Sequence, residues 1–326
     1  MTAKPRWATG VLLAAGAVAL VGALVVALAL AVRAGPAPRQ EATAWVPFDA
    51  NSVLRTPVPA ESHVDVASPA VTARLVADGR VYASLVEFGI PIYTAEADTP
   101  RYRVSCLRLQ WGPCPFDDTG TPIPDGARPH SGSDGAMVVV DEEAQLSYEF
   151  WQAQPVGSRW TTSFGAINPL NGSGWGGAAT GAGASRLAGV VRLFEIQDGQ
   201  IDHALALQSN NACVGVFRAP AVKTDGRSDR ADCVPEGSRL RLDPAIDVES
   251  LDLPPAQLTV ARAFQRYGGF VVDVGGAPLS ISFELAADAE GTYPGEVYQS
   301  AGLTWDYDGL DGIPWQGLQM LAEEER

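Results

Sequence analysis

Glu149 and Trp151 occupy positions in the chain where they could hold a sugar. They share one face of the alternating segment 146–151, opposite the apolar Tyr148 and Phe150. On an exposed sheet face, an indole can stack on the CH groups of a sugar ring while a carboxylate accepts hydrogen bonds from its hydroxyls. In the alternative interpretation, Trp151 caps the core and Glu149 is a solvated edge charge.

His203 is a second candidate for chemistry. It alternates with Ile201 and Leu205, so we expect its side chain to be at least half buried. A buried imidazole needs a hydrogen-bond partner. His203 is therefore either a structural residue bonded to a backbone carbonyl, or a general base or ligand at the floor of a groove.

Further carboxylates lie at the ends of apolar runs or within them. A glycoside hydrolase needs two such groups about 5–9.5 Å apart, a distance that spacing in the chain does not determine. If the protein is an enzyme, we expect a glycoside hydrolase or a polysaccharide lyase. The candidate catalytic residues are Glu149, Glu195, His203 and Asp141, with Asp134 as a further carboxylate, and the candidate substrate-binding residues are Trp151, Trp175 and Asp273.

Tryptophans beside glycine or turn residues, such as Trp111 and Trp175, add to the carbohydrate hypothesis because loop aromatics are frequent in ligand sites.

Motifs for metal binding are weaker. The segment 306–311 resembles a Ca²⁺ loop, but no glutamate stands at position 12, so a solvated turn is the alternative. We expect no other cofactor and assign no metal ligands.

The four cysteines predict disulfide bonds, since an even number in an exported chain is typical of an oxidising compartment. Of three possible pairings we predict Cys106–Cys114 and Cys213–Cys233, because each pair brackets a short, turn-rich loop. Neither spacing is C-x-x-C and the chain has only three histidines, which argues against structural zinc.

The N-terminal part has a different composition. Residues 11–32 are uncharged and apolar, and as a helix they would span about 33 Å, close to the roughly 30 Å of a bilayer core. We predict an uncleaved membrane anchor, with a cleaved signal peptide as the alternative. The predicted organisation is a short cytoplasmic N-terminus (1–10), a transmembrane helix (11–32), a Pro/Ala-rich stalk (33–60) and an extracytoplasmic β-domain (61–326).

The β-domain must position these side chains. Alternating segments such as 279–285 and the apolar run 137–140 predict strands, and a helix is predicted from Pro254 to Tyr267, leading into a strand at 270–274. We expect a mainly β fold: a single large, jelly-roll-like β-sandwich with one or two packed helices. The Gly-rich segment 168–185 is predicted to be a long loop crossing the sandwich.

Three segments, covering most of the region 85–285, together resemble a group of secreted or membrane-anchored bacterial proteins of unassigned function, common in actinomycetes. The resemblance implies that the segments form one fold unit, and it implies no activity, cofactor or catalytic residue. The segments are Ser133–Trp151, Gly189–Leu205 and Arg266–Asp273.

The net charge of −15 argues against binding to nucleic acid, so no nucleic-acid partner is expected. The sequence predicts a membrane-tethered extracytoplasmic protein that binds, and could cleave, cell-envelope or environmental carbohydrate. The alternative is a non-catalytic structural or adhesion protein of the cell surface that binds a protein partner. The oligomeric state is left open.

Overall fold

The computed structural model describes residues 46–116, 120–177 and 179–323. The predicted membrane helix at 11–32, the N-terminal segment before it and the first part of the stalk lie outside these residues. Within the described part of the chain, no helix has the length and apolar character needed to cross a bilayer.

The largest sheet has six strands, and the main hydrophobic core lies against it. Two of its pairs, β1·β16 and β11·β15, are parallel and the other pairs are antiparallel. In spatial order its strands are β1 (Tyr82–Ser84), β16 (Ser280–Ser282), β11 (Leu205–Ser209), β15 (Gly269–Val274), β14 (Arg239–Leu242) and β17 (Leu318–Met320).

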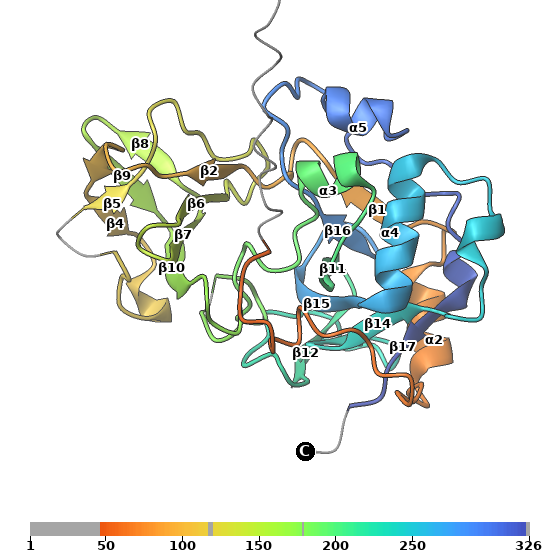
Figure 1. Ribbon diagram of the computed structural model, residues 1–326. Coiled ribbons are helices and arrows are strands. Elements are labelled where there is room, and N and C mark those ends of the chain that lie inside the picture. The colour runs from red at the N-terminus through yellow and green to blue at the C-terminus, as the bar shows by residue number, and fades with distance from the viewer. Residues whose placement is uncertain (1–45, 117–119, 178, 324–326) are drawn as a thin grey trace, which may run out of the picture. The chain divides into compact units, whose positions relative to one another are not determined.

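Helix α4 (Pro255–Arg266) packs on this sheet (Figure 1) and confirms the predicted helix. A proline at its first position suits the start of a helix, and its buried stripe ends in Phe264, which meets Trp315 edge to face at 5.3 Å. Gly268, with φ +65°, turns the chain directly into β15. The other helices are α2 (Ser68–Leu75), α3 (Leu193–Asp198), α5 (Glu296–Ser300) and the 3-10 turns η1 (Leu109–Trp111), η2 (Val248–Ser250) and η3 (Trp315–Gly317).

A second sheet of four strands has its own core, in which Phe116 and Phe150 stack at 4.9 Å. Its strands in spatial order are β10 (Phe164–Pro169), β7 (Leu146–Trp151), β6 (Met137–Asp141) and β2 (Ile92–Thr94). Smaller sheets are formed by β3 (Arg101–Tyr102) with β5 (Thr121–Pro122), by β4 (Val104–Cys106), β9 (Arg159–Thr162) and β8 (Gln154–Val156), and by β12 (Ala212–Phe217) with β13 (Val234–Glu236).

The mainly β class is confirmed, but the finer expectation of one jelly-roll-like sandwich with one or two helices is wrong. The described residues form several sheets with parallel pairs and four α-helices, whereas a jelly roll is antiparallel. Alternation in a sequence marks the buried face of a strand and does not identify the neighbour or its direction. Both predicted disulfides, Cys106–Cys114 and Cys213–Cys233, are confirmed.

Candidate functional site

Glu149 lies in β7 with no exposed surface (0%), so the expectation of an exposed face is wrong for this residue. Its carboxylate accepts hydrogen bonds from Ser147 Oγ (2.8 Å), from Ser185 Oγ and from the backbone N–H of Arg186 (2.7 Å). Burial raises the pKa of Glu149, and these hydrogen bonds oppose that shift. The glutamate thus anchors the segment around residues 185–186 to the four-stranded sheet.

Glu195 and His203 form a buried pair. His203 Nε2 lies 3.0 Å from Glu195 Oε1, and His203 Nδ1 donates to the carbonyl of Ala204 at 2.9 Å. Glu195 also accepts from the backbone N–H of Arg192 and so caps the start of α3. Burial lowers the pKa of His203, but the adjacent Glu195 outweighs it and the net shift is upward. The pair joins α3 to the turn before β11, and the strand predicted at His203 starts only at Leu205.

Asp141 ends β6 and has a local partner. Its Oδ1 accepts from the backbone N–H of Ala144 at 2.8 Å, which fixes the turn into β7, and its Oδ2 lies 3.9 Å from the guanidinium of Arg101. Asp141, Glu149 and the Glu195–His203 pair are thus placed by the structure at separate structural junctions.

The carboxylates of the segment 306–311 are also used locally. Asp306 accepts from the backbone N–H of Val86 (2.7 Å), and Asp311 pairs with Arg80 at 3.2 Å. These contacts hold the turn against neighbouring chain segments.

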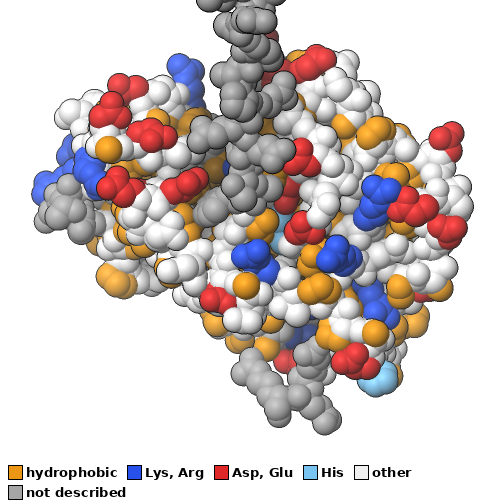
Figure 2. Space-filling view, viewed as in Figure 1, with side chains coloured by type: hydrophobic (Ala, Val, Ile, Leu, Met, Phe, Trp, Pro, Cys, Tyr) orange, Lys and Arg blue, Asp and Glu red, His pale blue; other side chains and the backbone are white. Residues whose placement is uncertain are grey.

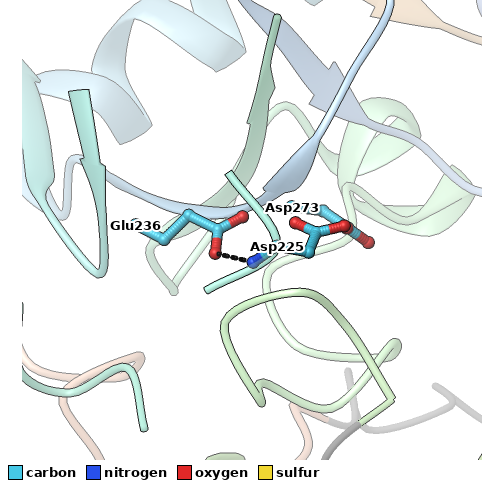
Figure 3. A group of neighbouring side chains, drawn as sticks. All are labelled: Asp225, Glu236 and Asp273. Carbon is cyan, nitrogen blue, oxygen red and sulfur yellow. Dashed lines mark hydrogen bonds between the residues drawn. The ribbon is translucent and has the colours of Figure 1, made fainter. Parts of the chain in front are cut away.

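Asp273 is brought together with two residues that sequence reasoning missed, Asp225 and Glu236 (Figure 3). Asp273 belongs to β15, Glu236 ends β13, and Asp225 lies in the loop between β12 and β13. One carboxylate oxygen from each residue lies within 4.8 Å of the other two. We call Asp225, Glu236 and Asp273 the acidic cluster. They come from separate segments, so spacing in the chain carried no signal of their convergence.

Two cations face the acidic cluster. Arg186 lies 3.3 Å from Asp273, while Lys223 is within electrostatic reach of all three carboxylates. Burial raises the pKa of Glu236 to about 8, and the charge of Asp225 adds to this. Burial also raises the pKa of Asp273 to about 6, against the opposing effect of Arg186. When ionised, the three carboxylates therefore carry more negative charge than the two cations and the hydrogen bonds compensate.

Several buried polar atoms near this region have no hydrogen-bond partner among the described residues. Such atoms are rare in folded proteins and point to an unfilled interaction. Trp175, predicted to bind substrate, is half buried and packs edge to face on Phe270 at 5.6 Å. The unpartnered atoms include Glu236 Oε1, Arg186 Nε, His130 Nδ1 and Trp175 Nε1.

Trp151, also predicted to bind substrate, takes part in a different surface feature. It faces Phe164 across the β7·β10 pair, and Trp111 packs over both rings, with centroid distances of 5.5 Å to Trp151 and 5.8 Å to Phe164. Trp111 keeps 52% of its surface exposed. We call Trp111, Trp151 and Phe164 the aromatic platform.

A disulfide loop holds the aromatic platform in place. Trp111 lies between the bonded Cys106 and Cys114, and the loop is tied to the segment 162–163 by backbone hydrogen bonds from Leu107 (2.8 Å) and Arg108 (3.0 Å). The guanidinium of Arg108 lies 5.9 Å from the centroid of Trp111. The indole is therefore exposed on a constrained loop.

Lys223 links the two features. Its ammonium lies 5.6 Å from the ring centroid of Phe164, and it also interacts electrostatically with the acidic cluster. The aromatic platform and the acidic cluster therefore share one cation.

Comparison of the chain with known protein families, curated proteins and solved structures finds no match. The resemblance to secreted actinomycete proteins accordingly stays a prediction.

Proposed function

We propose that the protein is a membrane-tethered, extracytoplasmic protein that binds cell-envelope carbohydrate through the aromatic platform without cleaving it. The two disulfides indicate an oxidising, extracytoplasmic compartment. The tether rests on the apolar sequence of residues 11–32.

The observation that carries this proposal is the half-exposed Trp111, held on a disulfide loop against two further aromatic rings. A fixed indole costs little conformational entropy when it stacks on a sugar ring. Arg108 beside it can pair with a carboxylate or phosphate group. Figure 2 shows basic side chains at the edge of the molecule that carries β4 and β5 in Figure 1. Arg108 lies 5.9 Å from Trp111 and Lys223 lies 5.6 Å from Phe164, so the platform suits an anionic glycan.

Cleavage of the glycan has less support. A glycoside hydrolase needs two carboxyl groups on either side of an accessible bond. Glu149 and Glu195 are buried and occupied by hydrogen bonds, His203 is bonded to Glu195 and to the main chain, and Asp141 caps a turn. Binding without hydrolysis or lyase chemistry is therefore the function that we propose.

A second candidate is docking of a protein partner, the alternative adhesion role. Leu107 and Leu109 are exposed on the same disulfide loop as Trp111. Trp and Arg are enriched at protein interfaces, and the exposed leucines add apolar surface that a partner could cover.

The test uses the full-length chain in detergent and a panel of neutral and anionic bacterial envelope polysaccharides, with binding followed by calorimetry. Trp111→Ala should weaken binding of an anionic polysaccharide by about tenfold or more, since a stacked aromatic contributes roughly 1–3 kcal/mol. Trp305→Ala is the matched control, because Trp305 is 49% exposed and lies outside the platform. An equal effect of both substitutions, or no binding to any member of the panel, would refute the proposal.

The double substitution Leu107→Ser, Leu109→Ser separates the two candidates. Glycan binding should persist in this variant within about twofold. Loss of polysaccharide binding in this variant would contradict the aromatic platform as the surface that carries binding.

A further inference from the structure

We infer that the acidic cluster of Asp225, Glu236 and Asp273 is a binding site for Ca²⁺. The inference concerns a site next to the aromatic platform and does not depend on glycan binding. It rests on the spacing of the three carboxylates, an unpartnered buried oxygen, and the close packing of a glycine against two of the carboxylates.

The spacing of the carboxylate oxygens fits one ion. Oxygen ligands lie about 2.3–2.6 Å from Ca²⁺, so two ligands of the same ion are at most about 5 Å apart. One oxygen each from Asp225, Glu236 and Asp273 meets this limit, with all separations within 4.8 Å. Hard oxygen ligands of this kind suit Ca²⁺ rather than softer metals.

The second observation is the state of Glu236. Its side chain is fully buried (0% exposed), and its Oε2 accepts one hydrogen bond, from the backbone N–H of Asp225 at 3.2 Å. Its Oε1 has no hydrogen-bond partner and lies on the cluster side, near Gly181. A buried carboxylate oxygen without a partner costs free energy, and a cation bound there would remove that cost.

The third observation is the close approach of the chain at Gly181 to the cluster. A Cβ built on Gly181 would clash with Asp225 Oδ1 and lie 2.9 Å from Glu236 Oε1, so these carboxylates pack directly against the glycine backbone. Gly181 has no positive φ, so alanine suits its backbone conformation, but the added Cβ would displace the carboxylate of Asp225. Because Asp225 is exposed, an ion can reach the site from solvent.

The surrounding charges set the expected affinity. Arg186 holds one oxygen of Asp273, and Gly181 N–H donates to the other at 3.2 Å. Lys223 adds a second positive charge. These two cations compete with the ion, so we expect the weak affinity of extracellular calcium modules, with a Kd of about 10⁻⁴–10⁻³ M.

The experiment is a Ca²⁺ titration of the full-length chain in detergent at pH 8.5, where Glu236 is mostly ionised, after removal of divalent ions with a chelator. Calorimetry should give one saturable site, and 10 mM CaCl₂ should raise the melting temperature. Glu236→Gln, which keeps the size of the side chain, should weaken Ca²⁺ binding by at least tenfold. Asp229→Asn, which removes an exposed acid from the same loop, should change binding by less than twofold.

A second variant keeps the test decisive if Glu236→Gln fails to fold. Gly181→Ala should keep the fold by circular dichroism and lose Ca²⁺ binding, because its Cβ displaces the carboxylate of Asp225 from the cluster. Absence of saturable Ca²⁺ binding in the wild-type chain, equal binding in wild type and Glu236→Gln, or tighter binding of Mg²⁺ than of Ca²⁺ would each overturn the assignment. Trp111→Ala should leave Ca²⁺ binding unchanged, so failure of the calcium site and failure of the glycan proposal are distinguishable.

Discussion

Glu149 and Glu236 are both glutamates with no exposed surface, yet the chain surrounds them differently. Three donors converge on Glu149, from two serine hydroxyls and the backbone N–H of Arg186. Glu236 receives one backbone hydrogen bond and faces two other carboxylates, Asp225 and Asp273. The same side chain at the same burial is thus satisfied in one region and unsatisfied in the other.

The difference indicates what each residue is for. A buried carboxylate surrounded by donors rigidifies the segment that supplies them, which here is the region of Ser185 and Arg186. A buried carboxylate placed beside like charges costs stability in the free protein, and costs of this kind concentrate at binding sites. Glu149, predicted to be catalytic, is therefore better explained as structural, and the unpredicted Glu236 as a ligand.

The largest effect is expected from a pair of alanine substitutions, whose free energies of unfolding are measured by urea denaturation with chelator present. Glu149→Ala leaves three buried donors without their acceptor and should reduce the free energy of unfolding by about 4 kcal/mol. At pH 9, where Glu236 is ionised, Glu236→Ala removes a repulsive charge and should cost about 1 kcal/mol or less. If the two variants lose similar stability, the contrast between the regions is wrong.

Local features of the fold were predictable from the sequence. The two disulfides, the helix α4 and the strands β6, β7 and β15 follow from residue spacing, because loop closure and periodicity depend on near neighbours in the chain. The identities of neighbouring strands did not follow, since alternation carries no information about pairing.

The site was less predictable, for two physical reasons. Alternation placed Glu149 on the second face of β7, but the chain around Ser185 covers that face, so the residue is buried. Trp175 stood beside glycines like a loop aromatic, yet it packs on Phe270. The acidic cluster depends on contacts between distant segments, which only the folded chain brings together.

A smaller effect is expected in the pH dependence of stability around Glu236. The pKa of Glu236 rises on folding from 4.5 to about 8, so the folded state holds its proton more tightly. The stabilisation from this group is full below about pH 4.5 and is lost as the pH rises through about 8. Asp225, Asp273 and Lys223 face the group, and the side chain of Thr224 opposes the rise of its pKa.

The prediction is that Glu236→Gln, which cannot ionise, is more stable than wild type at pH 9 by about 2 kcal/mol and similar to it at pH 5, with chelator present. Urea denaturation across this range measures both values. Asp229→Asn should follow the wild-type curve. If wild type instead gains stability relative to Glu236→Gln between pH 5 and pH 9, the folded protein does not raise the pKa of Glu236 as described.

The two buried histidines repeat the contrast on a smaller scale. His203 has partners for both ring nitrogens, and Glu195 raises its pKa. His130 Nδ1 has no partner, and burial lowers the pKa of His130 to about 4. The unfolded chain therefore binds a proton at residue 130 that the folded chain releases, and stability should fall as the pH drops from about 6.5 to 4.

His130→Phe should remove this acid sensitivity, because phenylalanine can keep the contact with Phe88, whose ring centroid lies 5.5 Å from that of His130. The free energy of unfolding of the variant minus that of wild type should be about 1 kcal/mol larger at pH 4.5 than at pH 7. His63→Phe, at an exposed position, is the control and should show no such gain. If the free energy of unfolding of wild type and of His130→Phe changes with pH in the same way, water or another group satisfies His130 Nδ1. The other unpartnered atoms near the Gly-rich segment would then be weaker evidence for a ligand.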